Sequence, residues 1–328
     1  METQNRVSTR PVQRSGSKFS FNTGGGFAAI VLWSTSFAIA RSLSEHVGPL
    51  TAGASAYLIG GGFCLLRLWG AKTSIHSLGS LSRRYLLGCG FLFILYTAVI
   101  YAAVGLAKDR EQLLEIALVN YLWPAGTILL SLPLLNQRAS LWLLPGTALA
   151  LTGVFLVMTQ GADVSWRTFS EHLRSNPPAY VLALIAAAAW AVYSNLARRW
   201  SAPGLGGAVE LFVPATGVVL LIMRLFATEP TVWTGRSIGE AVVLGAVTAL
   251  AYALWDGAMR KGNLLLVVAG SYFTPLLSTL VSCAYLNLTP GPKLWVGCLL
   301  LVTGSLLSWI SVSDRPEVHR RQPASARL

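Results

Sequence analysis

Ten apolar stretches, each of about 20 residues, follow one another along this chain, and each is long enough to cross a bilayer core of roughly 30 Å as a helix. Apolar runs of this kind span membranes as helices, because lipid offers no partners for the backbone hydrogen-bonding groups. We therefore predict an all-α membrane protein with ten transmembrane helices. The predicted spans are 21–41, 50–70, 85–107, 112–135, 141–159, 178–197, 205–227, 238–259, 264–286 and 292–312.

The composition excludes an ordinary soluble domain. Charged residues make up 12% of the chain and the mean hydropathy is +0.58, whereas about a quarter of the residues in soluble domains are charged. A transmembrane β-barrel is also excluded, because its strands would appear as short segments of alternating polarity.

The distribution of the positive charges behind the net charge of +12 indicates how the chain is oriented in the membrane. With the N-terminus in the cytoplasm, eight Lys and Arg residues fall on the far side and 17 of the 25 fall on the cytoplasmic side. The positive-inside rule therefore places both termini in the cytoplasm, and we expect no nucleic-acid partner. The 17 residues are Arg6, Arg10, Arg14, Lys18, Arg67, Lys72, Arg83, Arg84, Arg138, Arg198, Arg199, Arg260, Lys261, Arg315, Arg320, Arg321 and Arg327.

The ten spans form two matching sets of five. Because five is an odd number, the second set must enter the membrane from the opposite side, which makes it an inverted repeat of the kind that many secondary transporters contain. We predict a first repeat over 21–159 and a second over 178–312. The polar segments 1–20 and 313–328 are predicted to be disordered cytoplasmic tails.

Residue matches at nearly constant offsets support this duplication. Trp33 matches Trp190 at an offset of 157 residues, and the run 120–124 matches the run 271–275 at an offset of 151. The glycines of the fifth span recur in the tenth span at the same offset of 151, and we interpret them as close helix–helix contacts. These glycines are Gly146 and Gly153, with Gly297 and Gly304 as their counterparts.

Two prolines, Pro124 and Pro275, occupy equivalent places inside predicted helices. Each removes a backbone hydrogen bond, so each predicts a kink. One interpretation is a purely structural bend, and the other is a pair of moving gates.

Deep aromatic and polar side chains are the candidate substrate-binding residues. A transporter of polar solutes needs polar groups at membrane depth, and buried Tyr and Trp need partners that a cavity supplies. Asp256 precedes Arg260 by four residues, so it forms either a local ion pair or a substrate contact. The candidates are Trp33, Tyr101, Asn120, Tyr121, Trp123, Trp190, Tyr252, Trp255, Asp256 and Tyr272.

The sequence lacks the motifs of several other classes. It has no Walker-A run for ATP, no hydrolase signature and no His or Cys pair at metal-ligand spacing. We therefore predict no catalytic residues, no metal and no cofactor, and a transporter rather than an enzyme.

Three runs carry a family resemblance. The ten-span plan resembles the EamA-like branch of the drug/metabolite transporter (DMT) superfamily, over roughly residues 21–312. The runs 30–35, 119–124 and 271–275 look like those of the YddG-type aromatic amino-acid exporters of bacterial inner membranes. The resemblance implies export of aromatic amino acids and related compounds by alternating access through one central cavity, in a multi-pass inner-membrane protein that we expect to be a monomer.

Two residues depart from the family pattern. Many EamA-like members carry an Arg early in the second span, roughly where this chain has Tyr57. Asp256 stands where similar proteins would be expected to carry an amide.

Other functions remain open at this point. A transporter of amphipathic drugs would need a deep, unpaired carboxylate, and only Asp256 comes close. A nucleotide-sugar carrier would need deep basic residues, whereas Arg67 and Arg224 lie near span ends. A membrane scaffold or lipid scramblase is the third class, although polar stripes in an inverted repeat are hard to explain in a scaffold.

The charge distribution makes a topological prediction. Loops 42–49, 108–111, 160–177, 228–237 and 287–291 should face outside. A cysteine placed at Ser165 should react with an impermeant reagent applied from outside, and one placed at Ser140 should not. The reverse labelling pattern would overturn the assignment.

Overall fold

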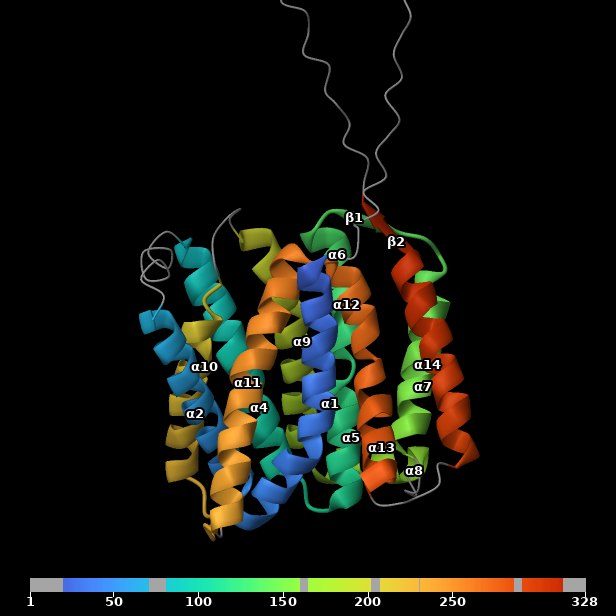
Figure 1. Cartoon of the computed structure of the whole chain (residues 1–328). Helices are drawn as coiled ribbons and strands as arrows, with labels where there is room; N and C mark the ends of the chain where they lie inside the picture. Colours follow the sequence, from blue (N-terminus) through green and yellow to red (C-terminus); the bar gives the residue numbers. More distant parts are fainter. Residues whose placement is uncertain are drawn as a thin grey trace, which may run out of the picture.

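A computed structural model describes residues 20–70, 81–159, 165–201, 207–229, 231–285 and 291–314 as a bundle of helices (Figure 1). The described chain begins and ends at the same end of the bundle, at the top of Figure 1. In chain order the elements are α1 (Phe21–Val47), α2 (Pro49–Gly70), the π-helix η1 (Tyr85–Cys89), α4 (Gly90–Gly105), α5 (Arg110–Asn120), α6 (Trp123–Leu134), β1 (Gln137–Ala139), α7 (Leu143–Met158), α8 (Trp166–Ser175), α9 (Pro177–Trp200), α10 (Val209–Leu225), α11 (Gly235–Lys261), α12 (Leu264–Ser271), α13 (Phe273–Tyr285), α14 (Pro292–Ile310) and β2 (Val312–Asp314).

Several of these helices can cross a membrane. By length and composition, six spans in the described part qualify, or up to eight when each of two bent helix pairs is counted as one span. The mostly helical membrane architecture is thus as predicted, apart from the short paired strands β1 and β2, while these spans are fewer than the ten predicted crossings. The predicted tails lie outside the described residues except for Ser20, Ser313 and Asp314. Ser313 and Asp314 were predicted to be disordered but belong to β2, which pairs with β1.

The most extensive helix contacts each join one helix from the first half of the sequence to one from the second half. α1 packs along α11, and α9 packs along α4. α2 packs along α10, and α7 packs along α14. Helices from the two halves of the sequence are therefore interleaved, and neither half forms a separate bundle.

Small residues bring α7 and α14 into backbone contact. A Cβ atom added to Gly153 would lie 2.5 Å from the backbone N of Leu301, and one added to Gly304 would lie 2.2 Å from the backbone N of Ala150. Lipid is as apolar as the side chains, so such helices associate through close packing rather than through the hydrophobic effect. The predicted packing role of these glycines is confirmed.

Polar contacts fasten α2 to α10 at both ends. At one end Arg67 pairs with Glu210. At the other, the Glu229 carboxylate accepts from the backbone N–H groups of Leu50 and Thr51, at 2.8 and 3.0 Å. A carboxylate at a helix N-terminus satisfies donors that have no partner within the helix and interacts favourably with the helix dipole.

Both proline segments interrupt their helices. Pro124 and Pro275 lie in the first turns of α6 and α13, after breaks at 121–122 and at Tyr272. The predicted kink is present next to Pro275, in the bend between α12 and α13. Both prolines lie in the first turn of a helix, where the N–H groups have no intrahelical partner and proline is tolerated. The two breaks differ in shape: α12 and α13 are bent by 43°, whereas α5 and α6 still read as one span, Arg110–Leu134.

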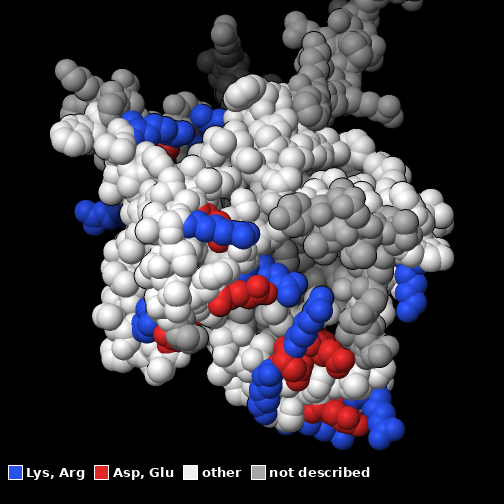
Figure 2. All heavy atoms as spheres, turned by 60° about the horizontal axis from the view of Figure 1, so that its bottom comes forward, with Lys and Arg blue, Asp and Glu red and all other residues white. Residues whose placement is uncertain are grey.

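The short amphipathic helix α8 lies within the predicted outside loop 160–177. A buried carboxylate holds it against the bundle: Glu115 of α5 lies 3.1 Å from Nδ1 of His172 and accepts from the hydroxyl of Tyr180. Figure 2 shows acidic and basic side chains intermingled at this end of the molecule. The ion pairs Arg41–Glu45, Arg167–Glu171 and Arg236–Glu240 belong to helices that reach this end.

The α7–α14 contact makes a prediction about stability. Gly153→Ala should lower the free energy of unfolding by about 1–3 kcal/mol, because the new methyl group must push the two backbones apart. Gly62→Ala is the matched control, since no atom lies within 4 Å of its added Cβ. Thermal unfolding of the detergent-purified protein measures both. Equal melting temperatures would contradict the packing assignment.

Candidate functional site

Aromatic side chains from five helices meet in the middle of the bundle. The group consists of Trp33 of α1, Phe93 and Tyr96 of α4, Trp123 of α6, Trp190 of α9, and Tyr252 and Trp255 of α11, and we call it the aromatic cluster. It joins helices from both halves of the sequence.

Trp190 is the centre of this cluster. Its ring lies 4.6 Å from that of Tyr96, and it stacks on Trp255 at 6.1 Å with an interplanar angle of 26°. Phe93, Trp33 and Trp123 also contact it, with centroids between 5.9 and 6.4 Å away. Such tilted and edge-to-face contacts are worth about 0.5–1.5 kcal/mol each beyond burial, so the cluster both binds helices together and provides aromatic surfaces.

The structure brings together five of the predicted site residues. Trp33, Trp123, Trp190, Tyr252 and Trp255 are linked by ring contacts, the closest being Trp33–Trp255 at 5.2 Å. The offset that matched Trp33 to Trp190 thus identified two rings that contact each other at 6.4 Å.

Hydroxyl groups border the cluster on the side of α2. The hydroxyl oxygens of Tyr57 and Tyr252 lie 2.5 Å apart, and the hydroxyl of Thr97 lies 3.4 Å from that of Tyr57. Tyr101 packs close to Gly53, where an added Cβ would lie 2.4 Å from the Tyr101 ring. Tyr101 therefore lies beside α2, and it forms no ring pair with the cluster among the described contacts.

Three predicted residues lie at the helix breaks instead. Tyr272 is fully buried in a second apolar group with residues of α7 and α14, and Tyr121 packs against the same group. The Tyr272 hydroxyl and Oδ1 of Asn120 have no hydrogen-bond partner among the described residues. The breaks therefore hold buried polar atoms that a bound molecule can satisfy.

Asp256 is buried in an ion pair. Nε of Arg260 lies 2.7 Å from Oδ2 of Asp256, and the exposed fractions of the two side chains are 7% and 4%. The hydroxyls of Tyr85 and Tyr193 lie 3.0 and 3.5 Å from Oδ1. Of the two interpretations of the 256–260 spacing, the ion pair is therefore present.

Sequence reasoning missed four residues of this region as site residues. Phe93 and Tyr96 lie in a stretch so uniformly apolar that no pattern marked them. Tyr193 follows Trp190 by three residues, so helical spacing placed it on the same face. Tyr85 reaches Asp256 from the π-helix η1, and π-turns of this kind occur frequently at functional sites.

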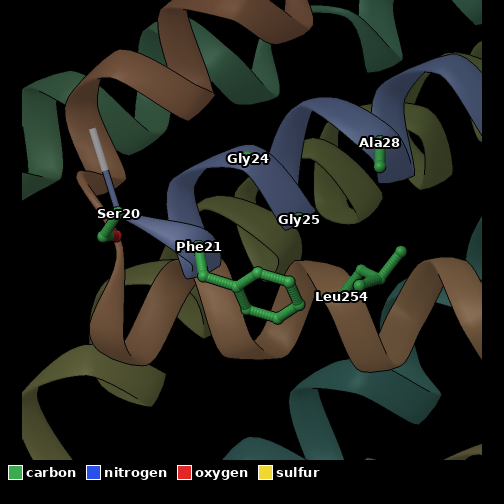
Figure 3. A pocket seen from close by; sticks show the side chains of 6 residues that line it. All are labelled: Ser20, Phe21, Gly24, Gly25, Ala28 and Leu254. Atoms are coloured by element: carbon green, nitrogen blue, oxygen red, sulfur yellow. The ribbon is translucent and has the colours of Figure 1, made fainter.

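A hollow lies on another part of the molecule. It has a volume of about 420 Å³ and is lined by the first turns of α1 and by Leu254 of α11 (Figure 3). Its walls are apolar except for Ser20 and contain none of the predicted site residues. Among the described residues, no group of three or more His, Cys, Asp or Glu side chains is arranged to hold a metal ion.

Known proteins similar to this chain define its family. The model of the EamA-like transporter family matches residues 24–159. The aromatic amino acid exporter YddG of Escherichia coli (strain K12) is 31% identical over 287 residues, which cover 87% of this chain and 96% of the relative. YddG of Ancylobacter novellus is 30% identical over 86% of this chain and 95% of its own length.

A more distant relative and a solved structure extend this comparison. A probable terminal-alkyne amino-acid exporter of Streptantibioticus cattleyicolor is 26% identical over 62% of this chain and 64% of its own length. One crystal structure superposes with a TM-score of 0.74 at 29% identity, covering 89% of this chain and 98% of that one. The chain belongs to the EamA-like transporter family and is a multi-pass inner-membrane protein.

Proposed function

We propose that this protein exports aromatic amino acids and related amphipathic metabolites from the cytoplasm, as a secondary transporter that works by alternating access. The observation that carries the proposal is the aromatic cluster, because its rings offer stacking surfaces for an aromatic substrate at the place where both halves of the chain meet. The relatives named as aromatic amino acid exporters support the same substrate class.

In this proposal the predicted site residues divide by location. Trp33, Trp123, Trp190, Tyr252 and Trp255 stack on the substrate ring once the cluster opens. Asn120, Tyr121 and Tyr272 act at the two helix breaks, and Tyr101 lines the side near α2. Asp256 contacts the substrate from the last turns of α11.

We propose that the ten predicted spans form two inverted repeats. The reciprocal packing supports this, because exchanging the halves turns the α1–α11 contact into the α9–α4 contact. The same exchange maps the α2–α10 and α7–α14 contacts onto themselves. Both termini are assigned to the cytoplasm from the Lys and Arg distribution, and we propose a monomer.

The buried carboxylate disfavours the alternatives. A drug transporter for cations would present an unpaired deep carboxylate, and Asp256 is paired. A nucleotide-sugar carrier would present several deep basic residues, whereas Arg67 and Arg224 make their ion pairs at the ends of α2 and α10 and the buried Arg260 is paired with Asp256.

Uptake of labelled amino acids into liposomes that contain the purified protein tests this function. Trp123→Ala removes ring contacts to Trp190 and Trp255. The concentration of tryptophan or phenylalanine that half-saturates uptake should therefore rise roughly two- to tenfold, with a smaller rise for small amino acids. Trp142→Ala, whose parent residue is 64% exposed, is the control. An equal loss for all substrates would indicate a folding role.

The same liposomes test energy coupling. No chain of Asp, Glu and His residues crosses the spans in the sequence, so we propose facilitated transport without obligatory proton coupling. An imposed pH gradient should then fail to concentrate substrate. Proton-driven accumulation would contradict this part of the proposal.

The helix breaks predict a gating role for the two prolines. A residue with an N–H at position 124 or 275 can bond the carbonyl of residue 120 or 271, so Pro124→Ala and Pro275→Ala should each favour a continuous helix and slow substrate exchange without unfolding the protein. Pro292→Ala, in the first turn of α14, is the matched control. Unchanged exchange rates in both variants would make the prolines structural bends only.

A further inference from the structure

The Asp256–Arg260 pair lies directly beside the aromatic cluster. Tyr193 belongs to both regions, since its ring lies 5.0 Å from that of Trp190 and its hydroxyl 3.5 Å from Oδ1 of Asp256. Trp255, the residue before Asp256, has a fully buried ring within the cluster. Aromatic surfaces and a pair of opposite buried charges are thus adjacent.

We propose that this pair binds the charged end of a zwitterionic substrate. Asp256 takes the α-ammonium group, Arg260 takes the α-carboxylate, and the aromatic cluster takes the side chain. This inference rests on the proposed function and adds to it the charge pattern that a substrate must carry.

Electrostatics favours a zwitterion over an ion of either sign. A buried charge that loses its partner is strongly destabilised, because it cannot recover its hydration. A zwitterion that inserts between Asp256 and Arg260 gives each of them a new partner, and the guanidinium fork matches a carboxylate. A cation would bind only Asp256 and an anion only Arg260, and either would disrupt the ion pair without compensating both of its members.

A second observation, in the aromatic cluster beside the pair, points to a ligand. The indole N–H of Trp255 is buried and has no hydrogen-bond acceptor among the described residues. Buried polar groups are normally satisfied, so this unsatisfied donor in the aromatic cluster is open to an acceptor that arrives with the substrate. A carboxylate oxygen is such an acceptor.

The competing explanation is that the pair only fastens α11 to η1 and α9. The same helix contains a matched control for this explanation. Arg236 and Glu240 have the same spacing and a similar contact, at 2.9 Å, but Arg236 is 73% exposed. Arg236→Gln removes this second pair at the opposite end of α11.

Competition in liposomes that contain the full-length protein tests the inference. Uptake of labelled phenylalanine is measured against tryptophan, tryptamine, which lacks the carboxylate, and 3-indolepropionate, which lacks the ammonium group. In the unmodified protein, tryptophan should compete at least tenfold better than either analogue. Equal competition by either analogue overturns the inference without any variant.

The variants should then respond reciprocally. Asp256→Asn should remove most of tryptophan's advantage over 3-indolepropionate and keep its advantage over tryptamine, and Arg260→Gln should do the reverse. Arg236→Gln should change neither ratio. A uniform loss for all three compounds in both variants overturns the inference and makes the pair a structural clamp.

Thermal stabilisation of the detergent-purified unmodified protein, measured with the three compounds and with leucine and its amine and acid analogues, keeps the inference separate from the proposed function. If labelled aromatic amino acids are transported but tryptophan competes no better than tryptamine or 3-indolepropionate, the inference falls and the function stands. If none is transported while zwitterionic leucine stabilises the protein more than its amine or acid analogues, the function falls and the inference stands. If neither transport nor such stabilisation occurs, both fall.

Discussion

The ring of Trp190 contacts aromatic rings of α1, α4, α6 and α11, and the centre of the bundle depends on these contacts. Helices in lipid gain little from the hydrophobic effect on association, so shape and ring geometry have to hold them together. The same surfaces suit an aromatic ligand. In our account, therefore, the substrate replaces contacts that the protein makes with itself.

The bundle contains two tightly joined helix pairs and two interrupted helices. α7 and α14 approach to backbone distance at their glycines, and α2 and α10 are fastened by an ion pair at one end and by hydrogen bonds to the Glu229 carboxylate at the other. The breaks before α6 and α13 instead leave a carbonyl without its helical partner, because proline follows four residues later. In our proposal the helices bend at these breaks during transport, and the two breaks differ in shape.

Sequence patterns predicted the features that repeat. Residue offsets singled out the glycines of α7 and α14 and the pair of Trp33 and Trp190, and all of these residues make the expected contacts. The matched prolines also indicated where the helices are interrupted, although each proline lies in the first turn of a new helix. The aromatic members of α4 could not be identified, since Phe93 and Tyr96 differ from their neighbours in no polarity pattern.

Contacts between distant segments were beyond sequence reasoning as well. The approach of Tyr85 to Asp256 depends on the local geometry of η1, and the contact of Glu115 with His172 depends on how α8 folds back on the bundle. Neither contact has a counterpart at the repeat offset. Only their three-dimensional arrangement shows that both buried carboxylates are partnered.

Photoaffinity labelling tests the location of the substrate site most directly. A tryptophan analogue with a diazirine on its indole ring would be incorporated into liposomes with the protein, activated by light, and located by mass spectrometry of peptides. The account predicts adducts on peptides of α1, α6, α9 and α11 that contain Trp33, Trp123, Trp190 or Trp255, and their loss when excess tryptophan is present. Protectable adducts confined to the hollow at the start of α1, or to the outer surfaces of α2 and α10, would contradict it.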